Sequence, residues 1–171
     1  MAAAFHRHVS PRRRSGFTLI ESALAMVIIG VGVVGMLQLL AAGSMANGEA
    51  TELTTAVNLA NNIHEIMVGL STFDPVNPAI WSKQGTLATY NDVISFNGDT
   101  YSPPLDVNRN SIAGMGAWSQ SVSVQTVAYS QLTTLETDDA TQPAVRVTVS
   151  IVHNGRPVYQ TSWVFCGVVP P

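Results

Sequence analysis

The chain has 171 residues and a net charge of −3, and only 11% of its residues are charged, against roughly 25% in typical soluble domains. The first 16 residues hold four arginines, whereas the remaining 155 hold four cations against eleven acids, a net charge of −7. This distribution leaves no basic surface on the body and argues against nucleic-acid binding. Cys166 is the single cysteine, so an internal disulfide is excluded, and we expect a small buried or half-buried side chain there.

The N-terminal part combines a basic segment with an apolar one. Residues 1–16 are basic and show no periodicity, which is typical of a leader that is not part of the fold. Residues 17–43 are apolar with only four polar interruptions, and about 20 apolar residues of helix cross a bilayer core. Because the arginines precede this segment and the next cation is Lys83, we expect the leader in the cytoplasm and the rest of the chain outside it.

One carboxylate, Glu21, lies near the start of the apolar segment. A charge at bilayer depth costs about 2.5–3.5 kcal/mol or more. The helix macrodipole favours an acid in the first turns by only about 0.3–1 kcal/mol, which does not offset that cost. We therefore expect Glu21 to need a cationic partner.

The helical pattern continues beyond the membrane-length segment. Over residues 44–70 the apolar residues are spaced by three or four, as in an amphipathic helix; they are Ala46, Ala50, Leu53, Val57, Ala60, Ile63 and Met67. Gly69 is a plausible end, and Pro75 prevents continuation. The sequence thus predicts one helix of about 50 residues, apolar in its first half and amphipathic in its second.

Residues 71–171 are predicted to form a globular, β-rich domain. Residues 71–117 contain four prolines and indicate loops with a short helix or strand. Alternation of apolar and polar residues predicts strands over 118–125, 145–151 and 158–165, and residues 130–142 are predicted to be a polar loop. The expected fold class is α+β, with the second half of the helix packed on a small antiparallel sheet.

The last two strands are separated by the hairpin signal Asn154-Gly155. A two-residue turn would pair Val145 with Val164 and place the large apolar side chains on opposite faces. A three-residue loop over 153–155 pairs Val149 with Tyr159, and all the large apolar groups then share one face. Because a slip of one residue turns every side chain over, we predict the three-residue loop.

The N-terminal residues also resemble a known family. The arginine cluster Arg12, Arg13 and Arg14, then Ser15 and Gly16-Phe17-Thr18-Leu19-Ile20-Glu21, resembles the N-terminus of type IV prepilins and of type II secretion pseudopilins. The resemblance covers residues 12–40. It implies that a prepilin peptidase cleaves after Gly16 and methylates the new amine of Phe17, and that Glu21 pairs with the Phe17 amine of a neighbouring subunit.

The resemblance also implies a function. It indicates a structural subunit, not an enzyme, with no cofactor, whose partners are a prepilin peptidase, other pilin or pseudopilin subunits, an inner-membrane assembly platform and the membrane. The protein is expected as a single-pass inner-membrane precursor with its globular domain outside the cytoplasm, and then in a pilus or pseudopilus. A minor pilin or pseudopilin is favoured, since Gln38 stands where many major pilins carry a proline and no C-terminal disulfide is possible.

Three other patterns have less specific explanations. Residues 30–35 match G-x-G-x-x-G, but that motif binds dinucleotides only between a strand and a helix, and here small residues in a membrane helix explain it better. His64-Glu65 lacks the second histidine of a zinc motif, which favours a solvated helix face. Residues 106–110 begin like a calcium loop but lack its glycine and its final glutamate, which favours a polar turn. No metal site is predicted.

Two alternative functions come from other classes of protein. An exported soluble protein would carry an ordinary signal peptide, cut near Ala46. Against it, the apolar run is long, Glu21 interrupts it early, and the helical stripe continues past the cut. A dinucleotide-binding enzyme is the more distant alternative.

Overall fold

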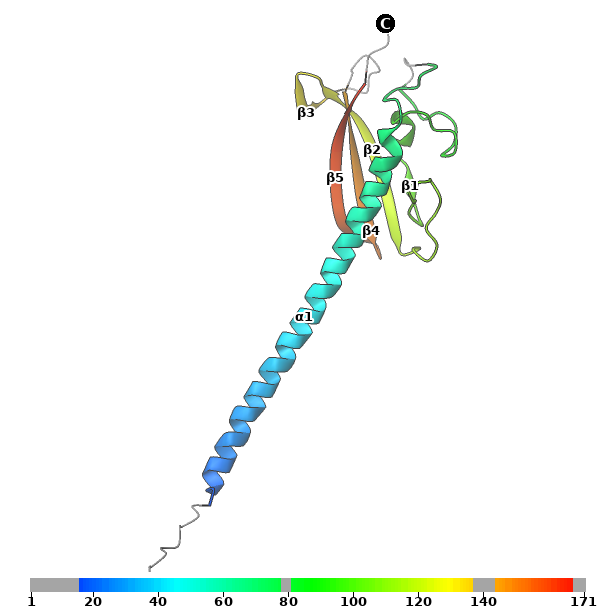
Figure 1. The fold of residues 1–171 in the computed structure, drawn as a ribbon. Helices are drawn as coiled ribbons and strands as arrows, with labels where there is room; N and C mark the ends of the chain where they lie inside the picture. Colours follow the sequence, from blue (N-terminus) through cyan, green and yellow to red (C-terminus); the bar gives the residue numbers. More distant parts are fainter. Residues whose placement is uncertain (1–15, 78–80, 137–143, 168–171) are drawn as a thin grey trace, which may run out of the picture. The chain divides into compact units, whose positions relative to one another are not determined.

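The computed structural model describes residues 16–77, 81–136 and 144–167 (Figure 1). It shows the predicted α+β fold, a long N-terminal helix followed by a small antiparallel sheet. Contacts within the chain divide it into two units, Met1–Asn47 and Gly48–Pro171. The two units are described separately below.

Helix α1 (Leu19–Val68) runs without interruption and ends immediately before Gly69, at the predicted position. Its first part is long and apolar enough to cross a membrane, and no residue of that membrane-length window is buried in the chain. Leu19 is 92% exposed and Leu39 is 76% exposed. The first part of the helix therefore contributes no side chain to the folded core.

The second part of α1 packs on the sheet through six buried residues: Ala56, Leu59, Ala60, Ile63, Ile66 and Met67. The predicted stripe was right for the last three of its positions, which are all buried. It was wrong for Ala46, Ala50 and Leu53, which are exposed. The sheet covers a neighbouring strip of the helix surface, so Ala56 and Leu59 face it instead.

The sheet has the order β1-β2-β4-β5, with β3 paired to β2 outside this path. The strands are β1 (Thr100–Tyr101), β2 (Trp118–Ala128), β3 (Gln131–Leu135), β4 (Ala144–His153) and β5 (Arg156–Cys166). The three predicted strands correspond to β2, β4 and β5. The prediction of a polar loop was wrong over 131–135, where β3 pairs with β2, and residues 137–143 lie outside the described residues. All five residues of β3 are exposed, so burial imposes no alternation there.

The β4–β5 hairpin combines a short turn with a β-bulge. Asn154 and Gly155 have φ values of 50° and 76°, as a two-residue type I′ turn requires, and His153 pairs with Arg156. The predicted three-residue loop was therefore wrong. The register then shifts at Val158, so that Ile151 pairs with Tyr159 and Val147 pairs with Trp163. The predicted pairing of Val149 with Tyr159 was also wrong, since Val149 pairs with Thr161. The extra residue still gives the predicted shared face, because the aromatic side chains lie on the inner face with the valines of β4.

Residues 71–117 cover one side of the core with irregular chain. Phe96, in the 3-10 helix η1 (Ile94–Phe96), is fully buried and lies edge-on to Tyr90, with 4.9 Å between the ring centroids. The carboxylate of Asp92 accepts hydrogen bonds from the Ser95 main-chain N–H and hydroxyl at 2.7 and 2.8 Å, which satisfies a buried charge. On β5, Cys166 is exposed, contrary to expectation, because it follows the outward-facing alternation of the strand.

Buried Gln120 connects three parts of the globular unit. Its Oε1 accepts a hydrogen bond from the Leu105 main-chain N–H at 2.6 Å, and its Nε2 donates to the Leu59 carbonyl of α1 at 2.7 Å. The side chain is completely buried, so each of these bonds replaces one that water would make. One strand residue thus fixes both the helix and the covering loop to the sheet.

Candidate functional site

Glu21 lies in the first turn of α1, where its carboxylate faces the start of its own helix. Its Oε2 accepts weak hydrogen bonds from the main-chain N–H and the hydroxyl of Thr18, both at 3.4 Å. In return, the Thr18 hydroxyl accepts a hydrogen bond from the Glu21 main-chain N–H at 3.4 Å. This reciprocal arrangement is a capping box, and the pattern T-x-x-E in the sequence could have predicted it.

The capping box does not supply a counter-charge. Glu21 is exposed, and among the described residues neither of the two ion pairs involves it. Apart from Thr18 and Ser22, the residues around it on the helix are apolar, and Ile20 is 79% exposed. An unpaired carboxylate on an apolar helix surface needs a cation from elsewhere once that surface is covered.

Gly16 and Phe17 precede the helix and are both exposed. A Cβ built on Gly16 would meet nothing within 4 Å, so the fold of this chain does not require glycine there. Phe17 is 73% exposed, and nothing in the described chain needs an aromatic ring at this position. Arg12, Arg13 and Arg14 lie outside the described residues, so their predicted role stays a prediction.

The G-x-G-x-x-G motif lies inside α1 and not between a strand and a helix. This contradicts the dinucleotide-binding alternative, whose motif requires a βαβ unit with parallel strands. The ladders between the described strands are all antiparallel. A Cβ on Gly30, Gly32 or Gly35 would meet nothing within 4 Å, so no contact within the described chain accounts for these glycines.

The loop of residues 106–110 forms the predicted polar turn. Asp106 Oδ1 accepts hydrogen bonds from the main-chain N–H groups of Asn108 and Asn110, both at 2.8 Å. The Asn110 N–H contributes most to lowering the pKa of the Asp106 carboxyl below its ordinary value. No group of three or more metal-ligating side chains occurs among the described residues.

His64 is not the solvated residue that the sequence suggested. Its ring centroid lies 4.7 Å from that of Trp163 and 5.9 Å from that of Phe165, both on the inner face of β5. The histidine is half-buried, as are the two aromatic residues. The alternation of β5 predicted the position of the aromatic residues, but not that α1 would place an imidazole against them.

A second cluster joins the β4–β5 hairpin to α1. His153 Nδ1 lies 2.6 Å from Glu52 Oε1, and the His153 ring stacks on Trp118 with 4.1 Å between centroids and 11° between planes. The Asn154 main-chain N–H donates to the Ala117 carbonyl at 2.8 Å, which holds the turn beside β2. Sequence reasoning missed this cluster because Glu52 and His153 are 101 residues apart.

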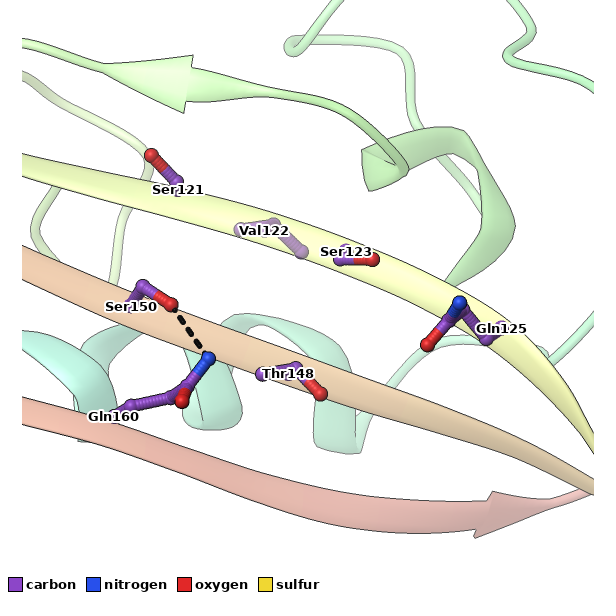
Figure 2. Close-up of a pocket in the computed structure, with 7 residues that line it drawn as sticks. All are labelled: Ser121, Val122, Ser123, Gln125, Thr148, Ser150 and Gln160. Atoms are coloured by element: carbon purple, nitrogen blue, oxygen red, sulfur yellow. Dashed lines mark hydrogen bonds between the residues drawn. The ribbon is translucent and has the colours of Figure 1, made fainter. Parts of the chain in front are cut away.

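The outer face of the sheet is largely polar and, among the described residues of β2, β4 and β5, has no acid. A shallow depression there is lined by hydroxyl and amide side chains from three strands, with Ser121 on β2, Thr148 on β4 and Gln160 on β5 (Figure 2). Gln160 Nε2 donates to the Ser150 hydroxyl at 3.0 Å across neighbouring strands. The described residues that line the depression include no acid, histidine or cysteine, so they form no convergent set of groups suited to catalysis.

Comparison with known proteins gives one finding. The prokaryotic N-terminal methylation motif matches residues 11–37, which include the candidate cleavage position, Glu21 and the first part of α1. This chain carries the type IV pilin and pseudopilin signature. No curated protein and no solved structure matched significantly.

The signature supports a general class for the protein. The motif supports a type IV pilin-like or pseudopilin precursor, and it points to a structural subunit rather than an enzyme. It implies processing by a prepilin peptidase and assembly with other pilins, and the apolar start of α1 indicates membrane anchoring before assembly. The exported-protein alternative stays an alternative prediction; against it, α1 continues unbroken through Ala46.

Proposed function

We propose that this chain is a minor pilin or pseudopilin, cleaved between Gly16 and Phe17 and built into a filament through the first half of α1. The observation that carries the proposal is the exposed apolar helix with one carboxylate near its start, matched by the methylation motif. In a membrane the lipid covers this helix, and in a filament the helices of neighbouring subunits do so. No residue of the membrane-length window is buried, so we expect the globular unit to fold without it.

Glu21 and the Phe17 amine are the proposed assembly pair. Cleavage after Gly16 creates a positively charged amine four positions before the carboxylate. Within one chain the capping box orients the Glu21 carboxylate toward the helix start. Its hydrogen bonds from Thr18 are long, at 3.4 Å, so a cation can replace them as a stronger partner. In a filament core, the amine of a neighbouring subunit supplies the missing charge and sets the axial position of one subunit on the next. Methylation of Phe17 leaves that charge in place.

Gly16 is the proposed recognition residue of the peptidase. Since no contact in the described chain requires glycine at position 16, the requirement has to come from an outside partner. The peptidase needs close access to the main chain on both sides of the bond, and a side chain at position 16 would obstruct it. The arginines at 12–14 then hold the leader on the cytoplasmic side of the inner membrane, facing the assembly platform.

Processing tests this proposal directly. We expect the mature protein, produced with a prepilin peptidase, to begin at Phe17 and to carry an N-methyl group there, as read by N-terminal sequencing and mass spectrometry. Gly16→Val should retain the leader, and Gly35→Val, a matched change within α1, should be processed normally. Native filaments containing chains that still begin at Met1 would contradict the proposal.

A further inference from the structure

Strand β5 forms one edge of the sheet, is long, and carries no charge after its first residue, Arg156. It pairs only with β4 among the described strands, and it spans 11 residues. From Pro157 to Gly167 there is no charged residue. Proteins usually protect an open edge with charged side chains, a short strand or a covering loop. Arg156, Pro157 and the bulge at Val158 protect the beginning of the strand, but among the described residues no charged side chain of β5 and no further strand protects the rest of the edge.

The opposite edge of the same sheet is covered. Along β2, the Val122 N–H donates to the Asp99 carbonyl at 2.8 Å, and the Val124 N–H donates to the Asn97 side chain at 2.9 Å. The short strand β1 and the exposed strand β3 pair with the two ends of β2. The fold therefore satisfies the hydrogen bonds of one edge from its own chain and leaves the other edge open in the described part.

The ladder shows which groups face the open edge. Val122 directs its N–H and carbonyl away from β4, so its pair with Val149 is of the non-hydrogen-bonded type. Because pair types alternate, Val149 bonds to Thr161 on its other side. By the same alternation Gln160, Ser162 and Val164 direct their main-chain N–H and carbonyl groups outward. A strand laid beside β5 would find a regular row of donors and acceptors.

The two faces beside this edge differ in chemistry. On the inner side Tyr159, Trp163 and Phe165 are only half-buried, and His64 of α1 lies against the latter two rings. On the outer side Gln160 and Ser162 are exposed, and Gln160 belongs to the polar surface of the sheet (Figure 2). An added strand would therefore place apolar side chains inward and small polar ones outward.

We propose that β5 binds an extended, uncharged segment of a different protein by β-strand addition, a mode in which main-chain bonds give affinity and alternate side chains give specificity. A second copy does not fit. Antiparallel self-pairing would reverse the direction of the second part of α1 between the two copies, whereas subunits of one filament run in the same direction; this step rests on the proposed function. Parallel self-pairing would set the aromatic row of one copy beside the polar face of the other.

The test uses the full chain in detergent micelles and a labelled synthetic peptide of about ten residues with alternating valine and threonine. N-methyl groups on one edge of the peptide prevent its self-association, and a control peptide carries them on both edges. Ser162→Pro removes one outward main-chain N–H without removing a hydrogen bond to β4. Ser162→Ala is the matched control, because alanine keeps that N–H. Fluorescence anisotropy measures binding, and thermal unfolding checks the fold.

We expect the wild-type chain and Ser162→Ala to bind equally, Ser162→Pro to bind about tenfold more weakly, and the control peptide not to bind. Amide hydrogen exchange of the wild-type chain gives an independent reading that does not depend on the variant folding. The amides of Gln160, Ser162 and Val164 should slow on peptide binding, while that of Thr161 stays unchanged. Absent peptide binding, equal binding of the doubly methylated peptide, or a concentration-dependent dimer that Ser162→Pro abolishes would overturn the proposal.

Discussion

Ile28 and Ile63 lie in the same helix, yet Ile28 is 63% exposed and Ile63 is completely buried. The difference separates α1 into two parts with different tasks. The second part stabilises the globular unit through the sheet. The first part has apolar surface that the described chain does not cover. Under the proposed function, the membrane and then neighbouring subunits cover this surface. Folding and assembly are thus assigned to different residues of one continuous element.

The largest expected effect on stability comes from making the same substitution in each of the two parts of α1. Ile63→Ala should destabilise the globular unit by about 2–5 kcal/mol, because it removes buried methyl groups and leaves a cavity. Ile28→Ala, the same change in the same helix, should leave the unfolding of the globular unit within about 0.5 kcal/mol of wild type. Denaturant unfolding of each full chain in micelles measures both. Equal losses would show that the two parts of the helix are not separate.

Gln120 gives the next largest effect. Gln120→Leu should cost about 1–3 kcal/mol, because the buried Leu105 N–H loses its acceptor, and the Leu59 carbonyl of the second helix part loses a donor. Gln125→Leu, on the exposed face of the same strand, is the control and should change little. The same unfolding measurement applies, and amide exchange at Leu105 should accelerate only in the Gln120 variant. A neutral Gln120→Leu would show that water replaces the lost partner.

The pair of Glu52 and His153 should give the smallest stability change. Both side chains are partly exposed, so Glu52→Gln should cost no more than about 1 kcal/mol. His153→Phe, which keeps the stacking on Trp118, should lose a similar amount, and the double variant should lose no more than either single one. A double-mutant cycle by thermal unfolding measures the coupling, with Glu49→Gln as the exposed control. Additive losses would mean that the two side chains do not interact in solution.

Much of the fold could be predicted because the spacing of apolar residues along the chain reflects which side chains are buried. The helix limits, three of the strands and the inward face of β5 all follow from spacing. The bulge at Val158 could not be predicted in the same way. The sequence required the aromatic residues to face the helix, and either a longer loop or an extra strand residue would achieve this.

The errors have physical reasons as well. Ala46, Ala50 and Leu53 continue the apolar pattern, but periodicity does not say which surface covers each position, and the sheet covers a different strip. Strand β3 is exposed at every residue and so has no burial pattern to detect. At the candidate site, the sequence predicted Glu21 as a site residue but not its capping box with Thr18. The T-x-x-E spacing of that capping box was present in the sequence. Contacts between distant residues, such as Glu52 with His153, have no local signal.

The central claim is that the first part of α1 assembles subunits through the charge of Glu21. Incorporation of Glu21 variants into filaments, at matched membrane levels, tests it most directly. Glutamine can keep the capping box but not the charge, so Glu21→Gln separates the two roles, and Glu21→Ala removes both. We expect both variants to be processed and folded normally, because Glu21 contributes nothing to the globular core.

Incorporation itself should fail for both variants, with Glu21→Gln only partly better than Glu21→Ala, because the neighbour's amine would be left without its partner at a cost of roughly 3–5 kcal/mol. Glu52→Gln, a carboxylate change in the second helix part, should be incorporated normally at temperatures where it stays folded. If Glu21→Gln and Glu21→Ala both enter filaments as well as the wild-type chain, Glu21 serves only as a helix cap and the account is wrong.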